Sequence, residues 1–144
     1  MTRFVILHHC LPPVGERQSH WDLMIECDGE LLTWALDECP KLNSRVSAIK
    51  LANHRIDYLE YEGPVSGGRG EVQRVESGSC TILHRDASRV SVHLRGETLH
   101  CVVNISRETN DVEQAQNLSQ VKYGESTGVQ RCTVSFMPVS NPPN

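Results

Sequence analysis

The chain has 144 residues and a formal net charge of −4, with 22% charged and 38% hydrophobic residues. This length and composition predict one ordinary globular domain. The acidity argues against a protein that coats duplex nucleic acid, because such binding depends on neutralising many phosphates. No apolar run is long enough to form a membrane-spanning helix, so we expect no membrane partner.

Six cysteines occur, and no two of them form the Cys-x-x-Cys pair that is typical of structural zinc sites. The apolar run that starts the chain, Phe4 to Leu7, is too short for the apolar region of a signal peptide. We therefore expect reduced, mostly buried cysteines in a cytoplasmic protein.

Short strands dominate the predicted elements. Residues 2–9 alternate as a strand does, and 24–36 form a hairpin that turns at Asp28-Gly29, the strongest short-range hairpin signal. Further along the chain, the alternation predicts strands over 45–53, 55–61 and 129–137, one hairpin that turns near 76–79, and one over 89–105 that turns at 95–97.

Helical periodicity is weak, and the best helix candidate covers 111–118. Many short strands separated by turn signals predict an all-β fold with little helix, arranged as a compact closed or nearly closed β-barrel. Closure is favoured because it leaves no exposed strand edge. We expect one domain over 1–138, a disordered tail over 139–144, and functional loops over 10–19 and 63–70.

One strand carries the residues that point to chemistry. Alternate residues of a strand share a face, so His20 and Asp22 lie side by side, with Met24 and Glu26 further along the same face. An imidazole and a carboxylate at this spacing suit manganese, zinc or iron. As a bare pattern, His-x-Asp is more often an ordinary exposed strand face.

A third ligand could come from His8 or His9 at the end of the first strand, and the periodicity does not choose between them. Adjacent Cys10 offers a different possibility, a zinc site made with one of these histidines and His20.

The next candidates are His54 and Tyr58, which would share one face of the predicted strand over 55–61 and its flank. Imidazole and phenol groups at that spacing could both donate hydrogen bonds to a phosphate. The alternative is a strand with a capping histidine and a half-buried tyrosine.

Together, these residues resemble the 3′-phosphoesterase domain of bacterial DNA ligase D. The resemblance covers roughly residues 4–106, and its motifs lie in four segments: 4–9, 20–26, 28–36 and 54–63. It implies a compact β-barrel with a manganese-dependent site that removes a 3′ ribonucleotide and then a 3′ phosphate from a primer strand in DNA repair.

The resemblance also implies a role for each site residue. His9, His20 and Asp22 match the Mn²⁺ ligands, and His54 and Tyr58 match residues that contact the scissile phosphate. His54 is then the expected catalytic residue beside the three ligands. Apart from the resemblance, the shared strand face makes Glu26 either a hydrogen-bond acceptor for a ligand histidine or a solvated strand carboxylate.

The chain also departs from the family pattern. Met24 stands where the family has a phosphate-binding arginine, which Arg17, Arg55 or Arg69 could replace. No counterpart of the family's N-terminal arm or of its ligase and polymerase modules is seen, so we expect a stand-alone protein that works with a separate ligase or polymerase.

Two other functions stay open. The same pocket could hold a phosphate or a nucleic-acid end without cleaving it. The chain could also be an interaction protein, since His84, His93 and His100 show that histidines occur here outside any motif.

Overall fold

The computed structural model describes residues 2–10, 19–65, 70–108 and 129–139. Within these ranges the chain forms nine strands and one short 3₁₀ helix. In chain order they are β1 (Thr2–Cys10), β2 (His20–Cys27), β3 (Glu30–Leu36), β4 (Ser44–Arg55), η1 (Ile56–Leu59), β5 (Gly63–Pro64), β6 (Glu71–Arg85), β7 (Arg89–Gly96), β8 (His100–Arg107) and β9 (Gln130–Pro138).

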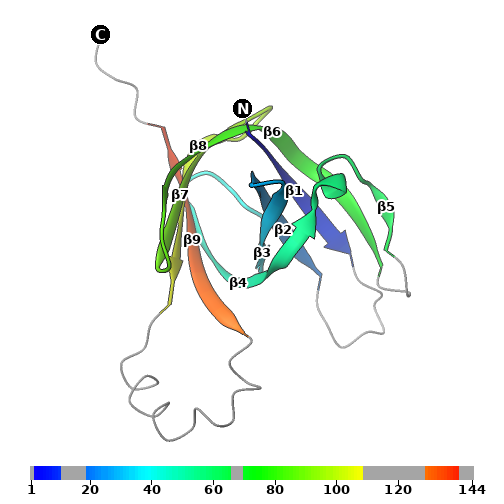
Figure 1. Ribbon diagram of the computed structural model, residues 1–144, viewed down its shortest axis with the longest axis horizontal. Helices are drawn as coiled ribbons and strands as arrows, with labels where there is room; N and C mark the ends of the chain where they lie inside the picture. Colours follow the sequence, from blue (N-terminus) through cyan, green and yellow to red (C-terminus); the bar gives the residue numbers. More distant parts are fainter. Residues whose placement is uncertain (1, 11–18, 66–69, 109–128, 140–144) are drawn as a thin grey trace, which may run out of the picture.

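The strands form one antiparallel sheet in the order β1-β2-β3-β4-β9-β8-β7-β6-β5, and β1 also pairs with β6. This last pairing closes the sheet into a barrel, and β5 adds a short outer edge to β6 (Figure 1). The all-β closed barrel predicted from the sequence is therefore confirmed. Closure satisfies the backbone groups that an open sheet would leave exposed at its two edges.

Two of the three predicted hairpins are confirmed. Asp28 and Gly29 have φ angles of 54° and 82°, the left-handed backbone that a two-residue type I′ turn requires. The β7–β8 hairpin also forms where it was expected. The helix candidate over 111–118 and the tail from residue 140 onward lie outside the described residues.

The predicted turn near residues 76–79 is wrong, because β6 runs through it without a break. Gly78 lies opposite Phe4 of β1 and Gly96 of β7, so β6 is flanked on both sides there. A Cβ built on Gly78 would lie 2.1 Å from the carbonyl oxygen of Arg95. The glycine therefore permits a close approach of strands where the sequence alone indicated a turn.

The barrel interior is filled by apolar side chains from all eight strands that form the barrel, including Phe4, Leu23, Trp34 and Phe136. Trp34 is 3% exposed, which agrees with its expected role as a core residue. Burial of this kind is the main favourable term in folding.

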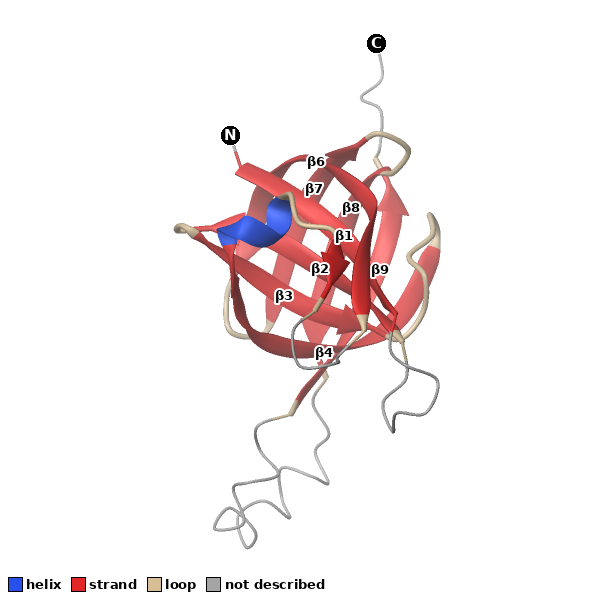
Figure 2. Cartoon of the chain, turned by 90° about the vertical axis from the view of Figure 1, so that its right-hand side faces the viewer, coloured by secondary structure: helices blue, strands red, loops and turns tan. Residues whose placement is uncertain are grey.

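A second, smaller apolar cluster lies on the outer face of the barrel wall. It contains the residues that alternate with the interior ones along β1 and β2, among them Val5, Leu7 and Met24, together with Leu59 of η1. The short helix covers this part of the wall (Figure 2).

The strand predicted over 55–61 is therefore wrong, since this segment holds η1. Alternation would have sent Ile56 and Leu59 to opposite faces of a strand. A 3₁₀ helix has three residues per turn, so both side chains reach the same cluster.

Among the described residues, no helix is both long enough and apolar enough to cross a membrane.

Candidate metal centre

His9, His20 and Asp22 come together on the outer face of the wall, where the end of β1 pairs with the start of β2. His9 lies directly opposite His20, and Asp22 lies opposite Leu7. One ligand atom from each of the three side chains can be chosen so that all lie within 4.8 Å of one another. Neighbouring antiparallel strands thus bring two imidazoles and one carboxylate to a single point, as the alternation predicted for His20 and Asp22.

The carboxylate lies between the two rings. Asp22 Oδ2 is 3.8 Å from His9 Nδ1, and Asp22 Oδ1 is 3.1 Å from His20 Nε2. The two imidazoles approach edge to face, with ring centroids 4.8 Å apart and an interplanar angle of 65°. The side chains are only 15%, 11% and 5% exposed for His9, His20 and Asp22, so water screens these charges poorly.

One oxygen of this carboxylate lacks the hydrogen bond that burial demands. Asp22 Oδ1 is buried, and no donor in the described residues meets hydrogen-bond geometry toward it. His20 Nε2 is close at 3.1 Å, but the contact has the distance of an ion pair without the direction of a hydrogen bond. A buried carboxylate oxygen in this state is costly unless a cation or a donor satisfies it.

The donor set fits a transition metal. Two imidazole nitrogens and one carboxylate oxygen form a group that binds manganese, iron or zinc and leaves further coordination positions open. Imidazole nitrogens make magnesium and calcium poorer matches, because those ions prefer oxygen ligands.

The alternation of side chains along β1 shows which of the two adjacent histidines, His8 or His9, joins the group. His9 shares the outer face with Val5 and Leu7, whereas His8 shares the inner face with Phe4 and Ile6. His8 stacks on Trp21, with ring centroids 4.4 Å apart and an interplanar angle of 6°.

Cys10 is next to His8 and not part of the group of three. Its Sγ lies 3.4 Å from His8 Nδ1. The structure brings no cysteine into the cluster of potential ligands among the described residues. This arrangement disfavours the alternative zinc site that would use Cys10.

Two further residues on the same strand face behave differently from expectation. Met24 is 1% exposed and belongs to the outer apolar cluster, so it packs where the family pattern has an arginine. Glu26 accepts a hydrogen bond from the backbone N–H of Arg3 at 2.8 Å and lies 3.8 Å from the Arg3 guanidinium. Its expected role as a partner of a ligand histidine is therefore wrong.

His54 and Tyr58 do meet, although not on one strand. His54 lies near the end of β4 and Tyr58 on η1, and their rings are in edge contact with centroids 5.5 Å apart. His54 Nδ1 lies 2.9 Å from the Ala52 carbonyl oxygen and, when protonated, donates to it. Tyr61 extends the row, with its ring centroid 5.9 Å from that of Tyr58.

This aromatic row borders an open pocket lined by Arg55, Asp57, Tyr58, Tyr61, Pro64 and Val65. Arg55 is exposed there and available to an anion. Tyr61 had no role in the sequence reasoning. Tyr61 lies two residues beyond η1, so its ring contact with Tyr58 depends on the path of the chain after the helix, which a strand prediction over 55–61 does not show.

Strand register sets the distance between the two groups of residues. His54 lies opposite Leu31, and Leu31 lies opposite Glu26, which is four residues along β2 from Asp22. At ~3.3 Å per residue, this offset is about 13 Å along the strand direction. The outer apolar cluster, to which Tyr58 packs, occupies the wall between the two groups. Arg17 and Arg69 lie outside the described residues.

The remaining histidines are on other surfaces. His93 and His100 stack at a centroid distance of 5.0 Å, and their Nε2 atoms are 2.8 Å apart. His84 lies 2.6 Å from Asp86. Neither arrangement includes a third ligand within the described chain.

Comparison with known proteins gives a consistent picture. The sequence profile of the DNA ligase D 3′-phosphoesterase domain matches residues 15–107. That range includes His20, Asp22, His54 and Tyr58, and it begins after His9.

Two curated proteins are similar over most of the chain. A multifunctional non-homologous end joining protein LigD from Pseudomonas aeruginosa is 28% identical over 140 residues, covering 90% of this chain and 17% of that protein. A multifunctional non-homologous end joining DNA repair protein LigD from Mycobacterium tuberculosis is 30% identical over 128 residues, covering 83% of this chain and 16% of that protein. The chain thus spans about a sixth of the length of these relatives.

Proposed function

Because the chain belongs to the DNA ligase D 3′-phosphoesterase domain family, with a role in nucleic-acid end processing during DNA repair, we propose that it is a manganese-dependent hydrolase of 3′ ends. Its substrates would be the 3′ phosphate, the 3′ ribonucleotide, or both, on a DNA or RNA–DNA primer strand. The observation that supports this proposal best is the convergence of His9, His20 and Asp22 around a buried carboxylate oxygen without a hydrogen bond.

Each ligand residue has a defined part. His9 and His20 would offer neutral imidazole nitrogens, and Asp22 would offer a carboxylate oxygen that offsets part of the cation's charge. A bound Mn²⁺ supplies Lewis-acid chemistry, which neutralises phosphate charge and lowers the pKa of water.

The second group of residues would hold the substrate. In this proposal His54 and Tyr58 donate hydrogen bonds to phosphate oxygens, His54 stabilises charge on the phosphate or acts as a general acid, and Arg55 adds a cation at the same pocket. Arg69 remains a further candidate for phosphate binding. The substrate strand would then lie along the outer wall, between the metal ligands and η1.

We also propose a cytoplasmic location and a separate enzyme that uses the product. All six cysteines, each within the described ranges, are free thiols, as expected for a reducing compartment such as the cytoplasm. A separate ligase or polymerase would use the processed 3′ end.

The first experiment measures phosphate release from a primer–template that ends in a 3′ phosphate, with Mn²⁺ or with EDTA. We expect release only with the metal, and roughly a hundredfold or greater loss in His20→Ala, since removal of even an outer partner of a ligand costs 10–100-fold. His100→Ala is the matched control, because it removes an imidazole from a different surface.

The same assay distinguishes the parts of the site. His54→Ala should raise KM for the phosphorylated end or lower kcat, whereas His100→Ala should change neither. Equal release with EDTA, or from the His20→Ala variant, would contradict the metal-dependent mechanism. Binding of the 3′-phosphate end without turnover would instead support a binding module, the function that the replacement of the family arginine by Met24 favours.

A further inference from the structure

A second pocket lies at one end of the barrel interior, where β4, β6, β8 and β9 meet the turn between β6 and β7. Its base is formed by apolar core residues that include Trp34, Ile105 and Cys132. Neither the proposed metal ligands nor the aromatic row of His54, Tyr58 and Tyr61 lines this pocket. We call it the barrel mouth.

Three cationic residues, Lys50, Arg85 and Arg107, line this pocket from β4, β6 and β8. Lys50 lies opposite Gln130 on β9 and reaches the face of Trp34, with its Nζ 5.3 Å from the ring centroid. Arg107 follows Ile105 by two residues on β8, so strand alternation gives it the same inward face. Arg85 lies opposite Val90, which packs against the interior core.

These cations have no carboxylate partner within the described residues. Lys50 donates to the carbonyl oxygen of Leu51, and Arg85 Nη1 donates to Cys27 Sγ at 3.4 Å; both acceptors are neutral groups. Lys50 is half-buried, whereas the two arginines are exposed at the rim. Burial lowers the pKa of Lys50, and the positive charge of nearby Arg85 lowers it further.

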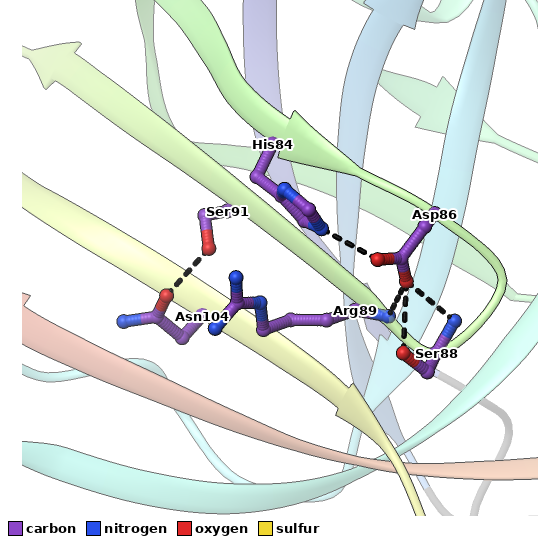
Figure 3. Close-up of polar contacts among 6 residues, drawn as sticks. All are labelled: His84, Asp86, Ser88, Arg89, Ser91 and Asn104. Carbon is purple, nitrogen blue, oxygen red and sulfur yellow. Dashed lines mark hydrogen bonds and ion pairs between the residues drawn. The ribbon is translucent and has the colours of Figure 1, made fainter.

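The carboxylates of Asp86, which also lines this pocket, and of Glu108, which follows Arg107, are engaged with other groups. Asp86 accepts hydrogen bonds from the backbone N–H of Ser88 at 2.8 Å and of Arg89 at 2.9 Å, and its other oxygen lies 2.6 Å from His84 (Figure 3). The Arg89 side chain extends away from this turn toward Asn104. Glu108 accepts a bond from Thr133 Oγ1 at 3.3 Å.

We propose that the barrel mouth binds a phosphate group through Lys50, Arg85 and Arg107, at a site separate from the metal centre. Three cations without a carboxylate partner among the described residues line one pocket beside apolar core residues, and the apolar wall reduces the dielectric screening of an oxyanion bound there. The phosphate can belong to a small anion or to a nucleic-acid strand, and the chemistry of recognition is the same for both. The site stands on these contacts and does not depend on the hydrolase activity.

The test is an NMR titration of the full-length isotope-labelled protein in EDTA. The probes are inorganic phosphate, a short single-stranded oligonucleotide with 3′-hydroxyl ends, and sodium chloride at matched ionic strength. The chain has two tryptophans, so the indole N–H signal of Trp34 can be assigned with a Trp21→Phe variant. We expect saturable shifts of Trp34 and of residues 86–89 with phosphate, with the oligonucleotide, or with both, and none with chloride.

The variants locate the site. Arg85→Gln combined with Arg107→Gln should weaken binding about tenfold or more, the loss expected for charge-assisted hydrogen bonds. Two control variants should bind phosphate as the unaltered protein does. Arg45→Gln removes an exposed charge of β4 that does not line the pocket, and His20→Ala removes a proposed metal ligand. If the double variant does not fold, the two single variants and Lys50→Met give the same comparison.

Three results would overturn the proposal. In the first, chloride reproduces the signal shifts that phosphate causes. In the second, the variant without both arginines binds phosphate as the unaltered protein does. In the third, Arg45→Gln loses as much affinity as that variant, which would indicate a bulk charge effect. Saturation by phosphate alone assigns the site to small anions, and tighter saturation by the oligonucleotide assigns it to a strand; both support the proposal. Because the readout uses no metal, failure here leaves the proposed hydrolase untouched.

Discussion

Asp22 shows how far single residues could be predicted. Alternation along β2 correctly placed its carboxylate beside His20, because both are fixed by the geometry of one strand. The same rule could not choose between His8 and His9, since it gives relative faces and not which face is the interior. It also could not show that Met24 is packed, because the outer apolar cluster depends on η1 folding back over the wall.

At this scale we predict a loss of metal-induced stability in Asp22→Asn. The amide keeps the shape of the carboxylate but removes the negative charge that would offset a cation. In the unaltered protein, Mn²⁺ at a hundredfold excess over its Kd should add about 2.7 kcal/mol to the free energy of unfolding. Differential scanning calorimetry with and without Mn²⁺ measures this as a rise in Tm of several degrees.

The control is Asp86→Asn, which alters a carboxylate in a surface turn and should keep the full metal-dependent rise in Tm. A rise of the same size in Asp22→Asn would exclude Asp22 as a ligand.

Strands and turns were predicted correctly where a local sequence signal determines the structure, and wrongly where contacts with residues distant in sequence determine it. The Asp28-Gly29 turn needs only two residues with left-handed backbone, so its sequence signature was sufficient. Gly78 carries a similar signature, but its role is set by β1 and β7, which lie far away in sequence. In the same way, η1 forms because Ile56 and Leu59 reach an apolar cluster built by other strands.

Gly78→Ala should therefore destabilise the barrel strongly. The added methyl would meet the Arg95 carbonyl oxygen at 2.1 Å and the Gly96 Cα at 2.9 Å, and backbone atoms cannot rotate away as a flexible side chain can. We expect a loss of about 3 kcal/mol, at the upper end of the cost of overpacking. Urea denaturation followed by tryptophan fluorescence gives the value.

Ser77→Ala, at the neighbouring half-buried position, adds no atom and removes a hydroxyl that makes no hydrogen bond among the described residues, so stability should change by less than about 0.5 kcal/mol. A Gly78→Ala variant as stable as Ser77→Ala would mean that β6 and β7 are further apart than described.

The barrel has an interior core that includes three thiols, and the proposed metal ligands lie outside that core. Cys80, Cys101 and Cys132 are buried in the interior cluster, whereas the other three cysteines are only partly buried, so the expected burial holds for half of them. The count of strands and turns was enough to predict closure. It could not supply the strand order, because the β1–β6 and β4–β9 pairings join segments that lie far apart in sequence.

Burial raises the pKa of the Cys101 thiol from its ordinary value of 9.0 to about 11, and Glu76 adds to the effect. Since the folded pKa is the higher one, the unfolded chain releases this proton first. The thiol therefore contributes stability that is complete below pH 9 and is lost as the pH rises toward about 11. Burial raises the pKa values of Cys80 and Cys132 in the same direction.

Urea midpoints measured from neutral pH to pH 11 should fall more steeply for the unaltered protein than for Cys101→Ala, because the variant lacks the thiol that ionises in this range. Lysines and tyrosines also titrate in this range, but they are common to both proteins and cancel in the difference. Parallel curves would show that Cys101 ionises alike in the folded and unfolded chains.

The packed interior leaves the proposed metal ligands on the outside of the wall. In the proposed function, a substrate would therefore dock laterally on this barrel, without being threaded through its interior. The part of a nucleic-acid strand beyond its reacting end can run on past the protein into solvent. Such a surface places no upper limit on the length of its substrate, which suits an activity directed at the ends of very long polymers.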